Sequence, residues 1–236
     1  MKNFIRVIAL GCLVTGAVGV NAQQISYPPL LNVVQLSANG SIEAQQDLLS
    51  ITLNTTRDGT DAGAVQSQLK AIVDAALTEA KKAAEPGQLD VRTGNFSLYP
   101  RYGRDGKPIG WQGSAEVILE GRDFARISGT AGKIQELTVG NVGFGLSRTQ
   151  RAKVEGDAQN IAIEQFKARA TEIARGFGFN SYTLREVNVN TNDQGFTPRP
   201  RMMAAEAKSA MADAPVPVEA GKTVVMVTVS GSVQLK

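Results

Sequence analysis

The fold of this chain is most constrained by two strand-type runs, residues 89–102 and 109–120, on either side of a short polar stretch centred on Asp105-Gly106. If these two central residues face each other in a turn, Phe96 must lie opposite Ala115. Apolar and aromatic side chains then collect on one face and polar ones on the other, and a slip of one residue would mix the two faces. The sequence therefore predicts a long antiparallel hairpin with one buried face.

The two predicted faces of this hairpin differ in composition. The apolar face carries Phe96, Leu98, Pro100, Tyr102, Ile109, Trp111, Ala115, Val117 and Leu119. The polar face carries Asn95, Ser97, Tyr99, Arg101, Gln112, Ser114 and Glu116.

The turn end of the hairpin is the candidate contact surface. Tyr99, Tyr102 and Trp111 fall close together in the sequence, beside Arg101 and Arg104. Trp, Tyr and Arg dominate the residues that carry binding energy at protein interfaces. We therefore expect an association site here, with a second copy of the chain as the favoured partner. The alternative is that Trp111 and Tyr102 simply continue the apolar face and are covered by a helix of the same chain.

Hydrophobic periodicity predicts further elements along the chain. Alternating or β-branched patterns indicate strands over residues 30–38, 42–56, 139–147, 181–191 and 222–235. Spacings of three and four indicate helices over residues 60–85, 122–137 and 149–178. Asn39-Gly40 suits a type I′ turn and predicts a hairpin between the first two strands. The order ββαββαβαββ is that of an α+β protein in which amphipathic helices cover antiparallel-rich sheets.

The longest predicted helix, 149–178, presents one apolar face. We expect that face to consist of Ile163, Phe166, Ala170, Ile173 and Phe177.

The chain contains no histidine, and its only cysteine is Cys12. These counts exclude Ser-His-Asp triads, Cys-His dyads and His-ligated metal centres. No phosphate-binding loop, nucleophile elbow or paired-cysteine metal motif is present. The sequence therefore predicts no catalytic residue, no cofactor-binding residue and no metal ligand.

Residues 1–22 have the pattern of a secretory signal peptide, with Lys2 and Arg6 before a short apolar run. We expect cleavage between Ala22 and Gln23 and a periplasmic mature domain over residues 23–236. The alternative is lipid attachment at Cys12. The apolar run is too short and too glycine-rich to span a membrane, so we expect no transmembrane segment in the mature chain.

Cleavage also changes the charge and the redox chemistry of the chain. The 25 Lys and Arg fall to 23 against 22 Asp and Glu, which is a net charge of +1. Such a balance provides no support for nucleic-acid binding. The mature domain would also contain no cysteine, so its stability must come from its core without disulfides.

Residues 192–221 hold four of the nine prolines and show no strand pattern. We interpret this segment as a flexible insert before the last strand. Its Met202, Met203 and Met211 leave open a role in binding a soft metal or in scavenging oxidants.

Three stretches, VRTGNFSLYPRYG (91–103), GNVGFGLS (140–147) and QLSANGSIEAQQDLLSITL (35–53), resemble the SIMPL-domain family. The resemblance covers about residues 31–235. The chain departs from the family pattern at Ser37-Ala38-Asn39-Gly40 and Gln46-Asp47, where relatives often show Ser-Gly-x-Gly and Pro-Asp. The resemblance implies an α+β periplasmic or outer-membrane-associated protein that sometimes self-assembles, in a group that includes immunogenic and oxidative-stress defence proteins. It implies no catalytic residue.

Residue chemistry and resemblance together favour a non-enzymatic envelope protein that acts through protein contacts, as a homo-oligomer or with other envelope proteins, in oxidative or envelope stress tolerance. An enzyme that uses carboxylate, Lys, Ser or Tyr chemistry is the alternative. Its candidate carboxylate pairs are Glu116 with Glu120 and Glu155 with Asp157.

Overall fold

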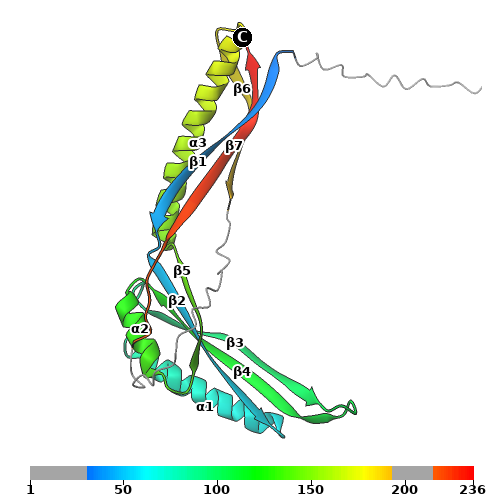
Figure 1. Cartoon of the computed structure of the whole chain (residues 1–236), viewed down its shortest axis with the longest axis vertical. Helices are drawn as coiled ribbons and strands as arrows, with labels where there is room; N and C mark the ends of the chain where they lie inside the picture. The colour runs from blue at the N-terminus through cyan, green and yellow to red at the C-terminus, as the bar shows by residue number, and fades with distance from the viewer. Residues whose placement is uncertain (1–30, 193–214) are drawn as a thin grey trace, which may run out of the picture. The chain divides into compact units, whose positions relative to one another are not determined.

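A computed structural model describes residues 31–192 and 215–236, and Asn32–Lys236 form one compact unit (Figure 1). The described residues contain mixed helices and antiparallel strands in the predicted order, which confirms the α+β class. The strands are β1 (Val33–Gln45), β2 (Leu48–Gly59), β3 (Asp90–Tyr102), β4 (Pro108–Gly121), β5 (Thr138–Gly145), β6 (Tyr182–Asn192) and β7 (Lys222–Leu235). The helices are α1 (Ala62–Lys81), α2 (Phe124–Lys133) and α3 (Arg148–Gly176).

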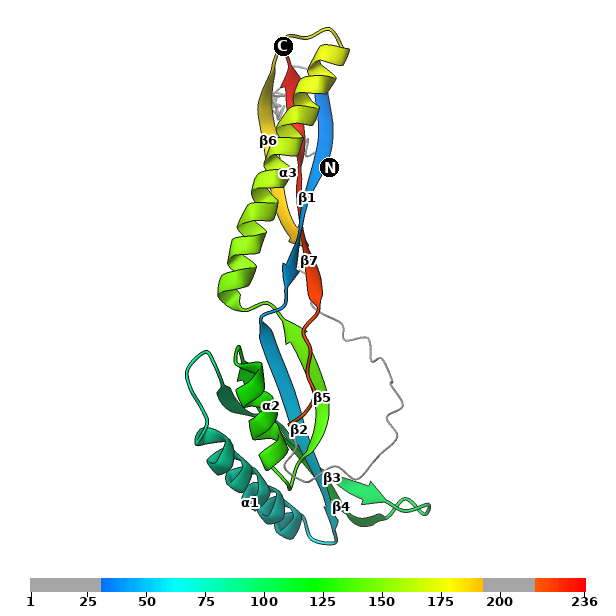
Figure 2. The ribbon, with the colours of Figure 1, turned by 60° about the vertical axis from the view of Figure 1, so that its left-hand side comes forward.

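The first sheet has the strand order β1-β7-β6, with both pairs antiparallel. Helix α3 packs on one face of this sheet, mainly over β1 and β7 (Figure 2). The buried residues of that layer include Phe166 of α3 and Val229 and Val233 of β7. The β-branched pattern of β7 therefore supplies the central strand of the sheet.

The predicted turn at Asn39-Gly40 is wrong, because both residues lie inside the continuous strand β1. Gly40 faces Val227 of β7, and a Cβ added to Gly40 would lie 2.0 Å from the carbonyl oxygen of Ala158 in α3. The missing side chain lets the helix backbone approach the strand closely. This glycine is therefore required for packing, and β1 continues to Gln45, with Gln46 and Asp47 linking it to β2.

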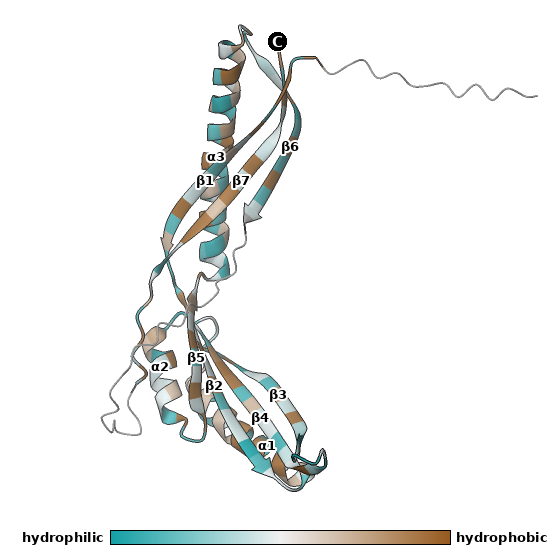
Figure 3. Ribbon diagram, turned by 45° about the vertical axis from the view of Figure 1, so that its right-hand side comes forward, coloured by the Kyte–Doolittle hydropathy of each residue, from teal (hydrophilic) through white to brown (hydrophobic). Residues whose placement is uncertain are grey.

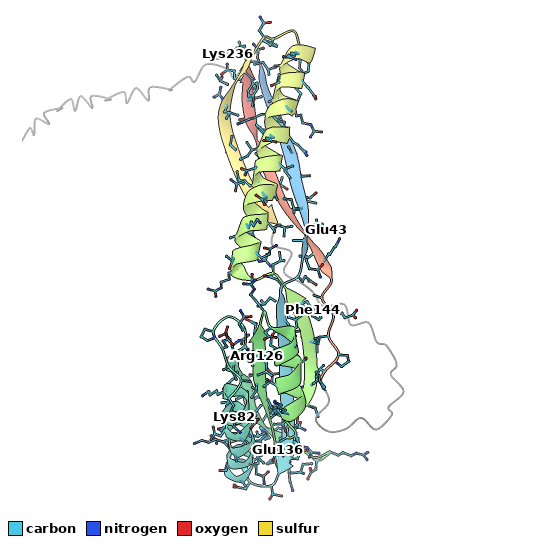
Figure 4. All side chains as sticks on the ribbon, turned by 90° about the vertical axis from the view of Figure 1, so that its left-hand side faces the viewer. Glu43, Lys82, Arg126, Glu136, Phe144 and Lys236 are labelled. Carbon is cyan, nitrogen blue, oxygen red and sulfur yellow. The ribbon has the colours of Figure 1, made fainter. Side chains whose placement is uncertain are left out.

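The second sheet has the order β3-β4-β2-β5 and is antiparallel throughout. The strands β1 and β2, adjacent in sequence, thus belong to different sheets. Helices α1 and α2 cover the core of the second sheet, and Figure 3 shows the apolar bands along its strands. Fully buried leucines at positions 49, 53 and 119 lie at the centre of that core. Phe124 of α2 and Phe144 of β5 add a tilted ring contact, with 5.7 Å between the ring centroids. Figure 4 labels Phe144.

Each helix begins at a polar side chain that accepts a hydrogen bond from the first turn: Asp61 for α1, Asp123 for α2 and Ser147 for α3. The buried residues of α3 recur at every fourth position from Val154 to Ala174. Phe166 and Ala170 are among them, as predicted. The prediction for Phe177 is wrong, because this residue ends the helix and is largely exposed.

Backbone contacts join the ends of the two sheets within this unit. The amide of Gln46 donates to the carbonyl of Gly221 at 3.0 Å, and the amide of Asp47 donates to that of Gly145 at 3.0 Å. Residues 193–214 of the predicted insert lie outside the described residues. After them, Val216 and Val218 pack against the core of the second sheet.

Candidate contact surface

The turn that joins β3 and β4 is centred on Asp105, half a residue from the predicted centre, because the register shifts between Arg101 and Tyr102. The amide of Gly103 donates to the carbonyl of Lys107 at 2.8 Å, and that of Gly106 donates to the carbonyl of Gly103 at 3.0 Å. Gly106 has a φ of 74°, a left-handed conformation that glycine adopts without strain. The predicted register is confirmed from Phe96, opposite Ala115, to Arg101. It is wrong by one residue from Asp90 to Thr93, because the register shifts between Thr93 and Phe96.

Three large side chains near this turn are exposed. Tyr102 is 63% exposed, Ile109 is 58% exposed and Tyr99 is 47% exposed. We call Tyr102 and Ile109 the hairpin-end surface, because Tyr99 pairs with Gln112 and lies on the opposite face of the hairpin. The turn projects away from α1 in two views (Figures 1 and 2). The helix that covers the rest of the sheet therefore leaves these side chains in water.

Trp111 is less exposed than a residue of the predicted contact surface should be. It faces Pro100 of β3 and Gly59 of β2, and it packs half-buried against the main core. The structure thus assigns Trp111 to the packing of the hairpin base. Ile109, two residues nearer the turn, is the exposed apolar residue that the argument from Trp, Tyr and Arg composition missed.

The two arginines of the predicted surface differ in their surroundings. Arg101 forms an ion pair with Asp58 of β2, with 3.7 Å between Nη1 and Oδ1. Both side chains are half exposed, so this pair adds little stability. Arg104 lies in the exposed turn itself. Both cations border the hairpin-end surface and are open to a partner.

Three of the four carboxylates of the alternative, enzymatic interpretation have a local contact. Glu116 accepts a hydrogen bond from the amide of Asn95 at 3.1 Å, and Glu120 pairs with Arg92 at 3.6 Å. Glu155 pairs with Arg151 at 3.6 Å. Such contacts are typical of surface carboxylates on strands and helices.

Shifted pKa values occur only at helix ends and one strand end among the groups that the structure describes. Hydrogen bonds from the backbone and side chain of Arg126 lower the pKa of Asp123. A hydrogen bond from the side chain of Lys82, together with its charge, lowers the pKa of Glu79, and a hydrogen bond to Glu43 raises the pKa of Lys222. Figure 4 shows Glu43 on β1 and Arg126 on α2. All of these groups are exposed, so the shifts reflect local capping and pairing.

Within residues 31–192 and 215–236, no group of three acidic, His or Cys side chains is placed to hold a metal ion. No helix in that part of the chain combines the length and apolar character needed to cross a membrane. Several predicted positions, Ala22, Gln23, Met202, Met203 and Met211, lie outside the described residues.

Three comparisons place the chain among known proteins. A family profile described as "SIMPL: Protein of unknown function (DUF541)" matches residues 34–233. No curated protein matches the chain. One similar solved structure, described as "The crystal structure of AtUAH in complex with glyoxylate", is 14% identical with a TM-score of 0.23. The match covers 56% of this chain and 34% of that one, and at this score it carries no argument about fold or ligand.

Proposed function

This chain belongs to the SIMPL family of proteins of unknown function, and from that premise we propose that it is a non-enzymatic protein of the bacterial cell envelope that acts through protein contacts. Copies of the same chain are the first partners that we propose, and other envelope proteins are the second. The proposed role of these contacts is tolerance of envelope or oxidative stress.

The observation that carries the proposal is the hairpin-end surface. Leaving an apolar side chain such as Ile109 in water is unfavourable relative to burying it, by about 25 cal/mol for each Å² of apolar surface. Contiguous exposed apolar groups bordered by polar ones are typical of interaction sites. Tyr102 and Ile109 next to Arg104 give this composition at the point where α1 no longer covers the sheet.

Export to the periplasm belongs to the same proposal. A cleaved signal at residues 1–22 would deliver the domain to the envelope, free of lipid, with Gln23 as its first residue. The absence of cysteine after Cys12 suits an oxidising compartment, because the folded domain then has no thiol to mispair.

A crosslinking experiment in intact cells tests the proposal. A photoreactive residue replaces Tyr102, and the same residue replaces Lys70, which is exposed on α1, as the control. We expect protein adducts, including the chain's own dimer, at position 102 and few at position 70. Equally sparse adducts at both positions would contradict a contact function for the hairpin end.

A further inference from the structure

Strand β6 has one unpaired edge within the part of the chain that the structure describes. It bonds to β7 on one side and is the last strand of the order β1-β7-β6. Figure 2 shows its other side facing outward. An open edge presents a row of backbone N–H and C=O groups that can pair with another strand.

Apolar side chains of β6 are also left uncovered. Helix α3 packs mainly over β1 and β7. Leu184, Val187 and Val189 lie on the same face as α3, because they pair with Val233, Gly231 and Val229 of β7, respectively. The three side chains are 42% to 54% exposed, whereas the two facing valines of β7 are buried. The apolar face of the sheet thus extends one strand beyond its helix.

The other sheet edges carry features that discourage pairing. On β1, Nη1 of Arg169 donates to the backbone carbonyl of Ser37 at 2.7 Å. Edge strand β3 contains Pro100, which has no N–H, and two arginines. Edge strand β5 has only 8 residues.

Residues 187–192 of β6, with the sequence VNVNTN, contain no charge, proline or glycine. This uncharged stretch is the edge most suited to pairing.

We propose that β6 pairs antiparallel with β6 of a second copy, about a two-fold axis perpendicular to the sheet. This axis keeps both α3 helices on one side, so facing residues must point to the same face. Two registers meet this condition and pair five uncharged residues each, and the one that includes Val187 puts Val189 opposite its own copy. It also puts Val187 opposite Thr191 and Asn188 opposite Asn190.

A second copy is favoured over a foreign strand because β6 complements itself in this register. Apolar side chains meet apolar or threonine side chains on the helix face, and asparagines meet asparagines on the other face. No charge requires an opposite charge from a partner. The inference rests on the proposed contact function and names the partner and the strand.

Cysteine crosslinking tests the register directly, since a chain that begins at Gln23 has no cysteine of its own. In Val189→Cys the Cβ atoms of the two facing cysteines would lie about 4.5–5.5 Å apart. Mild oxidation should therefore join the two thiols in a disulfide. In Asn188→Cys the two copies lie on a diagonal of about 7–8 Å and should crosslink far less. Val224→Cys, an exposed valine on β7, is the control for random collision. We expect a disulfide-linked dimer chiefly at position 189, and equal yields at all three positions overturn the pairing.

A charge on the edge gives an independent test that needs no disulfide. We expect Val187→Lys to lower the solution mass of the assembly, and the matched variant Val224→Lys to leave it unchanged. An assembly that persists in a folded Val187→Lys chain overturns the edge pairing and leaves the contact function standing. A wild-type chain that is monomeric at all concentrations overturns the pairing of β6 with its own copy and the proposal that copies of the chain are the first partners. Amide exchange in β6 that slows only when another envelope protein is added would assign the edge to a foreign strand.

Discussion

The carboxylate of Asp47 accepts two hydrogen bonds from Ser147, one from its backbone N–H and one from its Oγ, each at 2.7 Å. Asp47 lies between β1 and β2, and Ser147 caps helix α3, whose Gln150 amide donates to the same Oγ at 3.3 Å. Arg122 approaches the carboxylate at 3.5 Å. A negative charge is therefore fixed at the N-terminus of a 29-residue helix, where the helix dipole favours it.

We predict that Asp47→Ala lowers the free energy of unfolding by about 2 kcal/mol, because two charge-assisted hydrogen bonds are lost together. The measurement is denaturant unfolding followed by circular dichroism. The control is Asp157→Ala, an exposed carboxylate on α3, which should change stability by less than about 0.5 kcal/mol. Equal effects of the two substitutions would show that the Asp47–Ser147 contact does not anchor the helix.

Gly40 provides a packing prediction. Because a Cβ would lie 2.0 Å from the Ala158 carbonyl oxygen and 2.6 Å from the Ala162 amide nitrogen, Gly40→Ala must push α3 away from β1. We expect a loss of at least about 3 kcal/mol in unfolding free energy. A Gly40→Ala chain of wild-type stability would exclude this close approach.

The matched substitution Gly156→Ala should have the opposite sign. Gly156 lies in α3, and a Cβ there meets nothing within 4 Å. Alanine favours the helix over glycine by about 0.5–1 kcal/mol, so thermal unfolding should shift upward. A downward shift would place Gly156 in a contact that the structure does not contain.

Alanine substitutions of Trp111 and Tyr102 should differ in how much they lower the free energy of unfolding. Because Trp111 packs against the main core, Trp111→Ala should cost about 2–3 kcal/mol, below the range for fully buried aromatic residues. Tyr102→Ala removes an exposed ring and should change stability by less than about 0.5 kcal/mol. Denaturant titration of both variants measures this, and a neutral Trp111→Ala would return Trp111 to the surface.

The cap of α2 predicts a pH dependence. Arg126 lowers the pKa of Asp123 below its ordinary value of 3.8, so the folded state favours the ionised carboxylate. The resulting stabilisation is complete above the pKa of the unfolded chain, and it is lost as the pH falls through the lower pKa of the folded chain. Asp123→Asn should therefore be less stable than wild type at neutral pH, and the two should converge in acid. A difference that is independent of pH would contradict the ionic contribution.

Local patterns predicted the elements well, and long-range pairing explains where they failed. Periodicity located β7 and the start of α1, and the Asp105-Gly106 turn fixed the outer register of the hairpin. The role of Gly40 could not be deduced, because it depends on α3, more than a hundred residues later in the chain. The pairing of β1 with β7 could not be predicted for the same reason, because no residue near β1 in the sequence specifies a partner strand close to the other end of the chain.

Sequence reasoning placed the candidate residues near the turn between β3 and β4, but it did not decide which of them are exposed. Side-chain alternation correctly set Trp111 on the apolar face, but only the extent of α1 decides which residues of that face are covered. The exposure of Val187 and Val189 on β6 was also beyond sequence reasoning, because it depends on the position of α3 across the sheet. Coverage by a distant helix thus limits what alternation alone can predict.

The central claim, that this domain acts by association, is tested most directly by the solution mass of the purified mature chain. Multi-angle light scattering over a range of concentrations should give a mass above that of one chain for the wild type. A folded Ile109→Glu variant should give a lower mass, and Val139→Glu, at an exposed valine of β5 in the same sheet, should match the wild type. A wild-type monomer at every concentration, or an unchanged mass in Ile109→Glu, would contradict association through the hairpin end.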